Sequence, residues 1–135
     1  MTTVVYDTNI VVALLSQTDS LHEAAVESAV RWEAHGARAV ISAVSWSELR
    51  IGAMRQSLAA ERALIAFRVA AVDDIVPVDV DVAEIAASFR AADLSLRMPD
   101  ALILATGRHV GAAAVLTADK RLARVAPGLT ELVAV

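Results

Sequence analysis

The order of short apolar runs and helix-like segments is the feature that most constrains how this chain folds. Three such runs, TVVY at residues 3–6, AVI at 39–41 and AAVL at 113–116, are each followed by a segment with helical character. Runs without a polar alternate face are typical of strands buried on both faces of a sheet. Strands that alternate with helices pair in parallel, because each helix carries the chain back across the sheet. The sequence therefore predicts a parallel α/β fold with helices on both faces of the sheet.

Capping residues indicate where the helices begin and end. Ser20, with a glutamate three residues later, matches the reciprocal capping pattern, so a helix is predicted to begin at Ser20 and to stop at Gly36. Ser57 is expected to cap the second helix of a hairpin, and either Asp79 or Asp81 the helix after it. A first short helix is expected to start at residues 7–9. The other helices are expected at about residues 20–35, 43–56, 59–71, 79–92, 99–110 and 119–125. The expected strands are residues 3–6, 39–41, 75–78 at an edge of the sheet, 113–116 and 131–135.

Length and composition favour a single domain, residues 1–135. Hydrophobic residues make up 57% of the chain and aromatic residues 4%, so the core is expected to consist of Ala, Val, Leu and Ile. The absence of cysteine excludes disulfides, thiolate metal sites and cysteine nucleophiles, and a reducing cytoplasm is the expected compartment. The apolar N-terminus lacks a basic leader and contains Asp7, which argues against a signal peptide. No uncharged apolar run reaches the roughly 18 residues of a membrane span, so no membrane association is expected.

The charge balance is acidic. Twelve basic and sixteen acidic residues give a net charge of −4, which disfavours non-specific attraction to a phosphate backbone. Two divalent cations bound to acidic residues would bring the formal charge to zero, so acidity alone does not exclude a nuclease.

Four acidic residues follow strand-like runs or stand near helix starts, where open parallel sheets gather functional groups. Asp7 follows the first strand in VVYDTN, and the plain alternative is that it only caps the next helix. Asp100 lies in a first helical turn, where a carboxylate gains about 0.3 to 1 kcal/mol from the helix dipole. Helical spacing also places Asp100 at the head of a buried stripe, which a purely capping residue does not require. The stripe continues with Ile103, Leu104 and Gly107.

Glu48 and Asp119 each allow two interpretations. Helical spacing places Glu48 on one face with Val44, so we expect it to be buried rather than in solvent. A buried glutamate has a partner, which is either an arginine such as Arg55 or a metal ion or its water. Asp119 in VLTADKR follows a strand and either caps the short last helix or joins a site. Thr117 is placed to orient a neighbouring carboxylate through its hydroxyl.

The ends of two predicted strands bring these acids together. The strand ends after Tyr6 and Leu116 fall on the same edge of a doubly wound sheet, and the helix start at Asp100 can join them there. Carboxylates within about 4 Å of one another repel by roughly 4 kcal/mol per pair at an effective dielectric near 20. Such a cluster needs a cation, and oxygen-only ligands favour Mg²⁺ or Mn²⁺ over zinc. The acids together suggest a metal-dependent nuclease.

Four motifs, in order along nearly the whole chain, resemble those of the PIN-domain ribonucleases, and within them the VapC toxins of bacterial type II toxin–antitoxin modules. YDTNIVVALL resembles the family's opening strand and its Asp-[Ser/Thr]-[Asn/Ser] turn, and SWSELRIG resembles the segment with its central Glu. MPDALILATG resembles the helix with the third acid, and VLTADKRL resembles the Thr-x-Asp turn. One departure is Leu122, where many relatives carry an aromatic residue.

The resemblance implies a three-layer α/β/α domain with a mostly parallel central sheet. It also implies Mg²⁺-dependent endonucleolytic cleavage of RNA by a metal-activated water, with Mn²⁺ as a substitute, together with homodimerisation and neutralisation by a cognate antitoxin. The metal is expected on Asp7, Asp100 and Asp119, with Glu48 holding a second ion or a water. The acidic site implied by the resemblance is Asp7, Glu48, Asp100 and Asp119, supported by Thr8, Asn9 and Thr117.

Basic and aromatic residues allow weaker expectations. Four basic residues near the expected site are candidates for contacts with RNA phosphates, although a solvated basic face is an equally plain alternative: Arg97, Lys120, Arg121 and Arg124. The three histidines show no ligand spacing and are given no catalytic role. Trp46, Met54 and Phe67 are expected in the core or at a dimer surface, or as a docking place for an antitoxin segment.

Two other classes of function compete with a nuclease. A phosphoryl-transfer domain, such as a phosphatase or a receiver domain, is disfavoured because YDTNI lacks a second Asp two residues after the first. A non-catalytic PIN-like binding module is disfavoured because all four acids are present.

Overall fold

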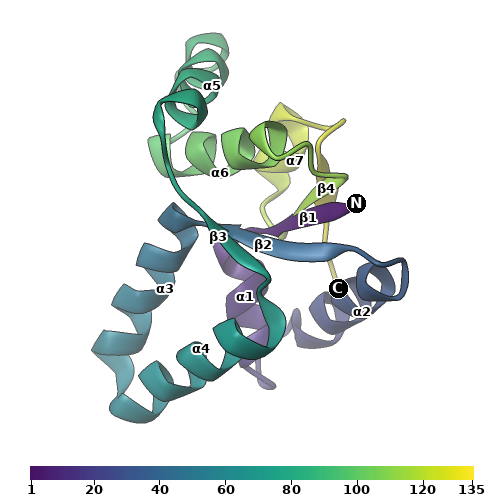
Figure 1. The fold of residues 1–135 in the computed structure, drawn as a ribbon, viewed down its shortest axis with the longest axis vertical. Helices are drawn as coiled ribbons and strands as arrows, with labels where there is room; N and C mark the ends of the chain where they lie inside the picture. The colour runs from purple at the N-terminus through teal and green to yellow at the C-terminus, as the bar shows by residue number, and fades with distance from the viewer.

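The computed structural model describes residues 1–135 and contains five strands and seven helices (Figure 1). The strands form one sheet in the order β3-β2-β1-β4-β5, and every neighbouring pair is parallel. The prediction of a parallel α/β fold is confirmed. The strands are β1 (Thr3–Tyr6), β2 (Arg38–Ser42), β3 (Asp74–Val76), β4 (Ala114–Thr117) and β5 (Thr130–Leu132).

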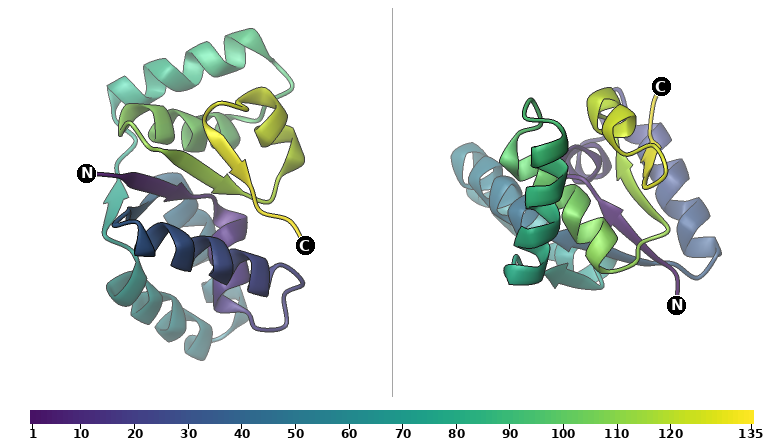
Figure 2. Two further views of the ribbon diagram at one scale, coloured as in Figure 1. Left: turned by 90° about the vertical axis from the view of Figure 1, so that its right-hand side faces the viewer. Right: turned by 90° about the horizontal axis from the view of Figure 1, so that it is seen from above.

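The helices lie in two layers, one on each face of the sheet. In Figure 1, α1 to α4 lie below the strands and α5 to α7 above them, and the side view of Figure 2 shows the same separation. The bounds are α1 (Thr8–Leu15), α2 (His22–Ala34), α3 (Ala43–Gln56), α4 (Leu58–Ala71), α5 (Val80–Ala92), α6 (Met98–His109) and α7 (Lys120–Val125).

Alternate residues of β1 explain the two layers. Val4 and Tyr6 pack in one core with residues of α1 to α4, whereas Val5 packs in another with Ile103 of α6 and Val115 of β4. A strand that is apolar on both faces is buried on both, as the β-branched run predicts. The chain thus has the three-layer α/β/α arrangement expected from its resemblance to PIN domains.

Most of the expected caps form, and one does not. Ser57 accepts a hydrogen bond from the N–H of Ala60, and Asp79 rather than Asp81 caps α5. The prediction that Ser20 begins α2 is wrong, because the helix starts at His22 and its N-cap, Leu21, has no capping side chain. The Oδ1 atom of Asp19 instead accepts a hydrogen bond from the N–H of Leu21, so an aspartate turn precedes the helix.

A glycine sets how closely α6 lies on the sheet. A Cβ atom added at Gly107 would collide with Cγ2 of Val115 on β4, and both residues are buried. The missing side chain therefore lets the helix backbone come close to the strand. Asp100 starts the same buried stripe of α6.

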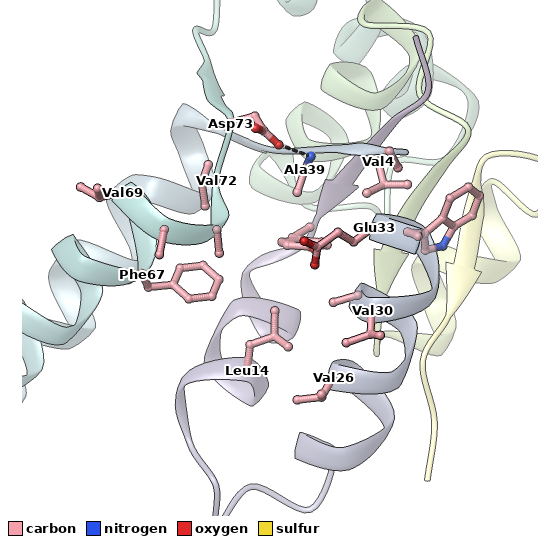
Figure 3. Close-up of a pocket in the computed structure, with 16 residues that line it drawn as sticks. Val4, Leu14, Val26, Val30, Glu33, Ala39, Phe67, Val69, Val72 and Asp73 are labelled. Carbon is pink, nitrogen blue, oxygen red and sulfur yellow. Dashed lines mark hydrogen bonds between the residues drawn. The ribbon is translucent and has the colours of Figure 1, made fainter. Parts of the chain in front are cut away.

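An open apolar groove lies between α2 and α4. Its volume is about 430 Å³, and 14 of its 16 lining residues are hydrophobic. Figure 3 shows Val26 and Val30 of α2 on one side, Phe67 and Val69 of α4 on the other, and Leu14 of α1 between them. Burial, helped by the charges of Glu33 and Asp73, raises the pKa of Tyr6 in this groove to about 12.

No helix is both long enough and apolar enough to cross a lipid bilayer.

Candidate metal centre and active site

Asp7 lies at the carboxyl end of β1, between two strands and a helix. Its residue is only 5% exposed, and its backbone N–H donates to the carbonyl of Leu116 on β4 at 2.9 Å. Its Oδ1 atom accepts a hydrogen bond of 2.7 Å from the N–H of Thr8 and caps α1. Its Oδ2 atom accepts from the hydroxyl of Thr117 at 2.7 Å and from the amide of Asn9 at 3.2 Å. Asp7 therefore caps α1, as the simpler interpretation of its position predicts. It also accepts hydrogen bonds from Thr117 and Asn9, which a helix cap does not require.

Asn9 and Thr117 join the ends of β1 and β4. The Asn9 side chain donates to Asp7, and its oxygen accepts from the N–H of Ala118 at 3.0 Å. The fully buried Thr117 hydroxyl donates to Asp7 and accepts from the N–H of Asp119 at 3.0 Å. The expectation that Thr117 orients a neighbouring carboxylate is confirmed, and the two strand ends meet as the parallel topology predicts.

Asp100 faces inward from the first turn of α6. Its side chain is 9% exposed and has two arginine partners. Nε of Arg97 lies 3.3 Å from Oδ2 and Nη2 of Arg97 lies 3.5 Å from Oδ1, while Nη2 of Arg121 lies 3.5 Å from Oδ2. The sequence placed these arginines near the site as contacts for RNA, and the structure pairs both with a site carboxylate.

Asp119 is the N-cap of α7. Its Oδ1 atom accepts a hydrogen bond of 2.8 Å from the N–H of Arg121, and its residue is partly exposed. Asp119 therefore caps the short last helix, which was one of the two interpretations of its position in the sequence. Its second carboxylate oxygen is not used by the cap.

Glu48 is exposed, so the expectation that it is buried is wrong. The buried stripe of α3 is Ser45, Leu49 and Ala53, and Glu48 lies beside this stripe rather than in it. Its partner is neither Arg55 nor another arginine, because Oε1 of Glu48 accepts a hydrogen bond of 2.8 Å from the hydroxyl of Thr8. Thr8 therefore links the start of α1 to the acid on α3.

The acids share one electrostatic neighbourhood without forming one ligand shell. Burial raises the pKa of Asp7, and the charges of Asp100 and Glu48 raise it further, against the lowering effect of the hydrogen bonds from Thr117 and Thr8. No three Asp, Glu or His side chains lie close enough to hold one metal ion together. Joint ligation of one ion by Asp7, Asp100 and Asp119 therefore stays a prediction, and in this arrangement each of the three acids has a partner within the protein.

The donor set nevertheless suits a divalent ion of the magnesium type. Mg²⁺ keeps several waters in proteins and is held by one or two carboxylates, with substrate phosphates completing its shell. Asp7 and Asp100 are buried carboxylates, and the charge of Asp100 raises the pKa of Asp7. Two such oxygen ligands, without sulfur or imidazole, fit Mg²⁺ or Mn²⁺ and do not fit zinc.

Comparison with known families decides the classification. The model of the PIN domain matches residues 4–127. The chain belongs to the PIN-domain family. None of the curated protein sequences is significantly similar to this chain.

Solved toxin–antitoxin structures share the fold of this PIN domain. A chain of VapBC2 from Rickettsia felis, solved with a promoter DNA fragment, superposes with a TM-score of 0.80 at 15% identity, covering 96% of this chain and 98% of that one. A chain of a toxin–antitoxin complex from Klebsiella pneumoniae gives 0.74 at 26% identity, covering 95% and 96%. VapC20 from Mycobacterium tuberculosis, described as a sarcin-ricin loop cleaving toxin, gives 0.70 at 22% identity, covering 97% and 99%. The resemblance to PIN domains is confirmed, and these solved chains share its fold.

The remaining basic residues and one serine complete the description of this PIN domain's site. Lys120 and Arg124 on α7 are exposed and form no ion pair. Sequence reasoning did not single out Ser45, which is fully buried and whose hydroxyl has no hydrogen-bond partner. The signal available in the sequence was its spacing, one helical turn before Glu48.

Proposed function

We propose that this PIN domain is a Mg²⁺- or Mn²⁺-dependent endoribonuclease that acts as the toxin of a type II toxin–antitoxin pair in the cytoplasm. The observation that carries the proposal is the buried Asp7 carboxylate, held by Thr117 and Asn9 at the edge where Asp100 and Glu48 also act on its charge. Burying a carboxylate beside two others costs free energy and does not help the chain to fold. Such arrangements are typical of functional sites. Membership of the family and the description of VapC20 support RNA as the substrate.

A divalent cation bound at Asp7 and Asp100 would supply an activated water and would stabilise negative charge at the scissile phosphate. The residues of the chain then have separate tasks. Thr117 and Asn9 fix the direction of the Asp7 carboxylate. Glu48 uses one oxygen to accept from Thr8, and its other oxygen is available to take the proton of the attacking water. Arg97, Arg121, Lys120 and Arg124 provide the positive charge that binds RNA phosphates.

Cleavage of total cellular RNA tests the proposal. The purified, metal-stripped protein is incubated with and without Mn²⁺ or Mg²⁺, beside Asp7→Asn and Asp100→Asn, and new 5′ ends are mapped. We expect discrete cuts that require the metal and that both variants lose while remaining folded. Metal-dependent cutting by folded Asp100→Asn at the wild-type level would refute the assignment of this acid.

A non-catalytic binding module is the competing interpretation, and metal binding separates the two. A ligand that binds only the folded state raises its stability, and the gain grows with the logarithm of the ligand concentration once this exceeds the dissociation constant. We expect millimolar Mn²⁺ to raise the melting temperature of the wild type but not that of Asp7→Asn. The absence of both stabilisation and cleavage would favour the binding module.

The apolar groove between α2 and α4 is the surface that we assign to the antitoxin. Val30 and Val69 are 57% and 81% exposed there, and large exposed apolar patches mark protein interfaces. The Klebsiella structure is described as a toxin–antitoxin complex, which supports such a partner. Phe67→Asp should abolish co-purification with the cognate antitoxin, whereas Met54→Asp, on the exposed side of α3 outside the groove, should not.

The proposed toxin is also expected to be a homodimer. Ile51, Met54 and Leu58 are more than half exposed on the α3–α4 hairpin and provide an apolar surface for a second copy. Light scattering of the free protein tests this, with a monomer at micromolar concentration as the contradicting result.

A further inference from the structure

The charge of Asp100 is balanced by the chain's own arginines. Asp100 is nearly buried, and a buried carboxylate requires a compensating charge. Arg97 approaches it with two nitrogens, and Arg121 approaches Oδ2 from α7 on the other side. This is the same carboxylate that the proposed function assigns to the metal.

The guanidinium of Arg97 lies among several acids. The hydrogen bond and the charge of Asp100 raise the pKa of Arg97, and the charges of Glu48 and Asp119 raise it further. Asp100, Glu48 and Asp119, three of the four acids predicted for the site, therefore all stabilise the positive charge of Arg97.

The ion pairs at Asp100 are long and open to solvent. Their N–O distances are 3.3 to 3.5 Å, whereas the pair between Arg31 and Glu131 measures 2.7 Å, within the usual range of a charge-assisted hydrogen bond. The side chains of Arg97 and Arg121 are 66% and 40% exposed, so each can swing into water without losing packing. Because the arginine ends are exposed, these pairs open at a lower cost than fully buried ones, provided that another cation then balances the charge of Asp100.

We propose that Arg97, assisted by Arg121, is an exchangeable counter-ion of Asp100, whose ion pair opens when a divalent cation binds and whose guanidinium then binds an RNA phosphate. This inference rests on the proposed function, and it adds that the two arginines regulate the binding of the cation at Asp100. A guanidinium binds phosphate as well as it binds carboxylate, so its release from Asp100 supplies a substrate contact at the moment the metal is bound. Arg97 is thus a positioning residue for the metal and a binding residue for RNA.

Opposite effects of one substitution on the affinity for Mn²⁺ and on the affinity for RNA distinguish this role from a structural one. Calorimetric titration of the metal-stripped full-length protein with Mn²⁺ alone should show that Arg97→Gln binds the ion about two- to fivefold more tightly than the wild type, because no ion pair has to open. The same variant should show a KM for RNA raised about fivefold. Arg97→Lys keeps the charge and should restore most of the wild-type Mn²⁺ affinity. Arg62→Gln, an exposed arginine of α4 outside the site, is the matched control and should change neither quantity.

The outcomes separate this inference from the proposed nuclease. If the wild type binds Mn²⁺ and cuts RNA while Arg97→Gln and Arg97→Gln/Arg121→Gln bind Mn²⁺ with unchanged or weaker affinity, the counter-ion role is refuted and the nuclease stands. If neither the wild type nor the double variant binds Mn²⁺, both are refuted. Binding by the double variant alone would support the counter-ion role in its strongest form.

Discussion

Substitution of Gly107 by alanine tests whether the approach of α6 to the sheet is as close as the structure shows. Alanine in a helix interior normally gains about 1 kcal/mol over glycine. Here the new methyl group would meet Val115, whose β-branched side chain is stiff and whose residue is fully buried, so it cannot move aside. Overpacking of this kind costs about 1 to 3 kcal/mol and exceeds the gain in most of that range. After subtraction of the gain from the cost, we expect Gly107→Ala to lower the free energy of unfolding by up to about 2 kcal/mol.

Gly52 provides the matched control in the same protein. It is also a helical glycine, but a Cβ atom there has no heavy atom within 4 Å. Gly52→Ala should therefore stabilise the protein by up to about 1 kcal/mol. Urea unfolding followed by circular dichroism measures both variants, and Gly107→Ala/Val115→Ala should show a positive coupling, since the smaller residue makes room for the methyl group. Stabilisation by Gly107→Ala equal to that by Gly52→Ala would refute the close contact.

Three further outcomes follow from the site and the core. Thr117→Val should lower cleavage at least tenfold and stability by about 1 to 3 kcal/mol, because it leaves Asp7 and the N–H of Asp119 without their partner; single-turnover kinetics and urea unfolding measure the two effects. The pKa of Asp7 is raised above 3.8, so its ionisation in the metal-stripped protein costs stability as pH rises; the unfolding free energy of Asp7→Asn relative to wild type should increase from pH 4 to pH 7, and a flat difference would contradict the burial. Leu122→Ala, in the core above the sheet, should cost about 2 to 5 kcal/mol in urea unfolding.

The order of strands and helices was predictable because it depends on local signals. The run at residues 3–6 became a central strand with the predicted bounds, and Ser57, Asp79 and Gly36 mark helix ends as expected. Parallel topology then brings the ends of β1 and β4 together without further information. Asp7 and Thr117 meet for this reason, although 110 residues separate them.

The surroundings of Glu48 could not be predicted from helical spacing. Two stripes of α3 are about equally apolar, one through Val44 and Glu48 and one through Ser45, Leu49 and Ala53. Which stripe is buried depends on how α3 packs against its neighbours, and the packing of α3 against α4 buries the second. Helical spacing alone favoured the first stripe, and the exposure of Glu48 shows that this prediction was wrong. Because Glu48 is exposed, its carboxylate is accessible to a water molecule, which a buried glutamate would not be.

Charge balance at the site depends on residues brought together by packing. Arg97 stands three positions before Asp100 and was within reach on sequence spacing, but Arg121 comes from α7 and arrives only through the packing of α7 beside α6. With Asp7, Glu48, Asp100 and Asp119 ionised, and these two arginines included, the formal charge of the site is −4 + 2 = −2. One divalent cation neutralises it, whereas the whole-chain charge of −4 had allowed two. Because the ion pair of Arg97 is proposed to open when the first cation binds, the four acids and Arg121 then carry −4 + 1 = −3 and one cation leaves −1, so a titration stoichiometry of two would show that Arg121 leaves as well.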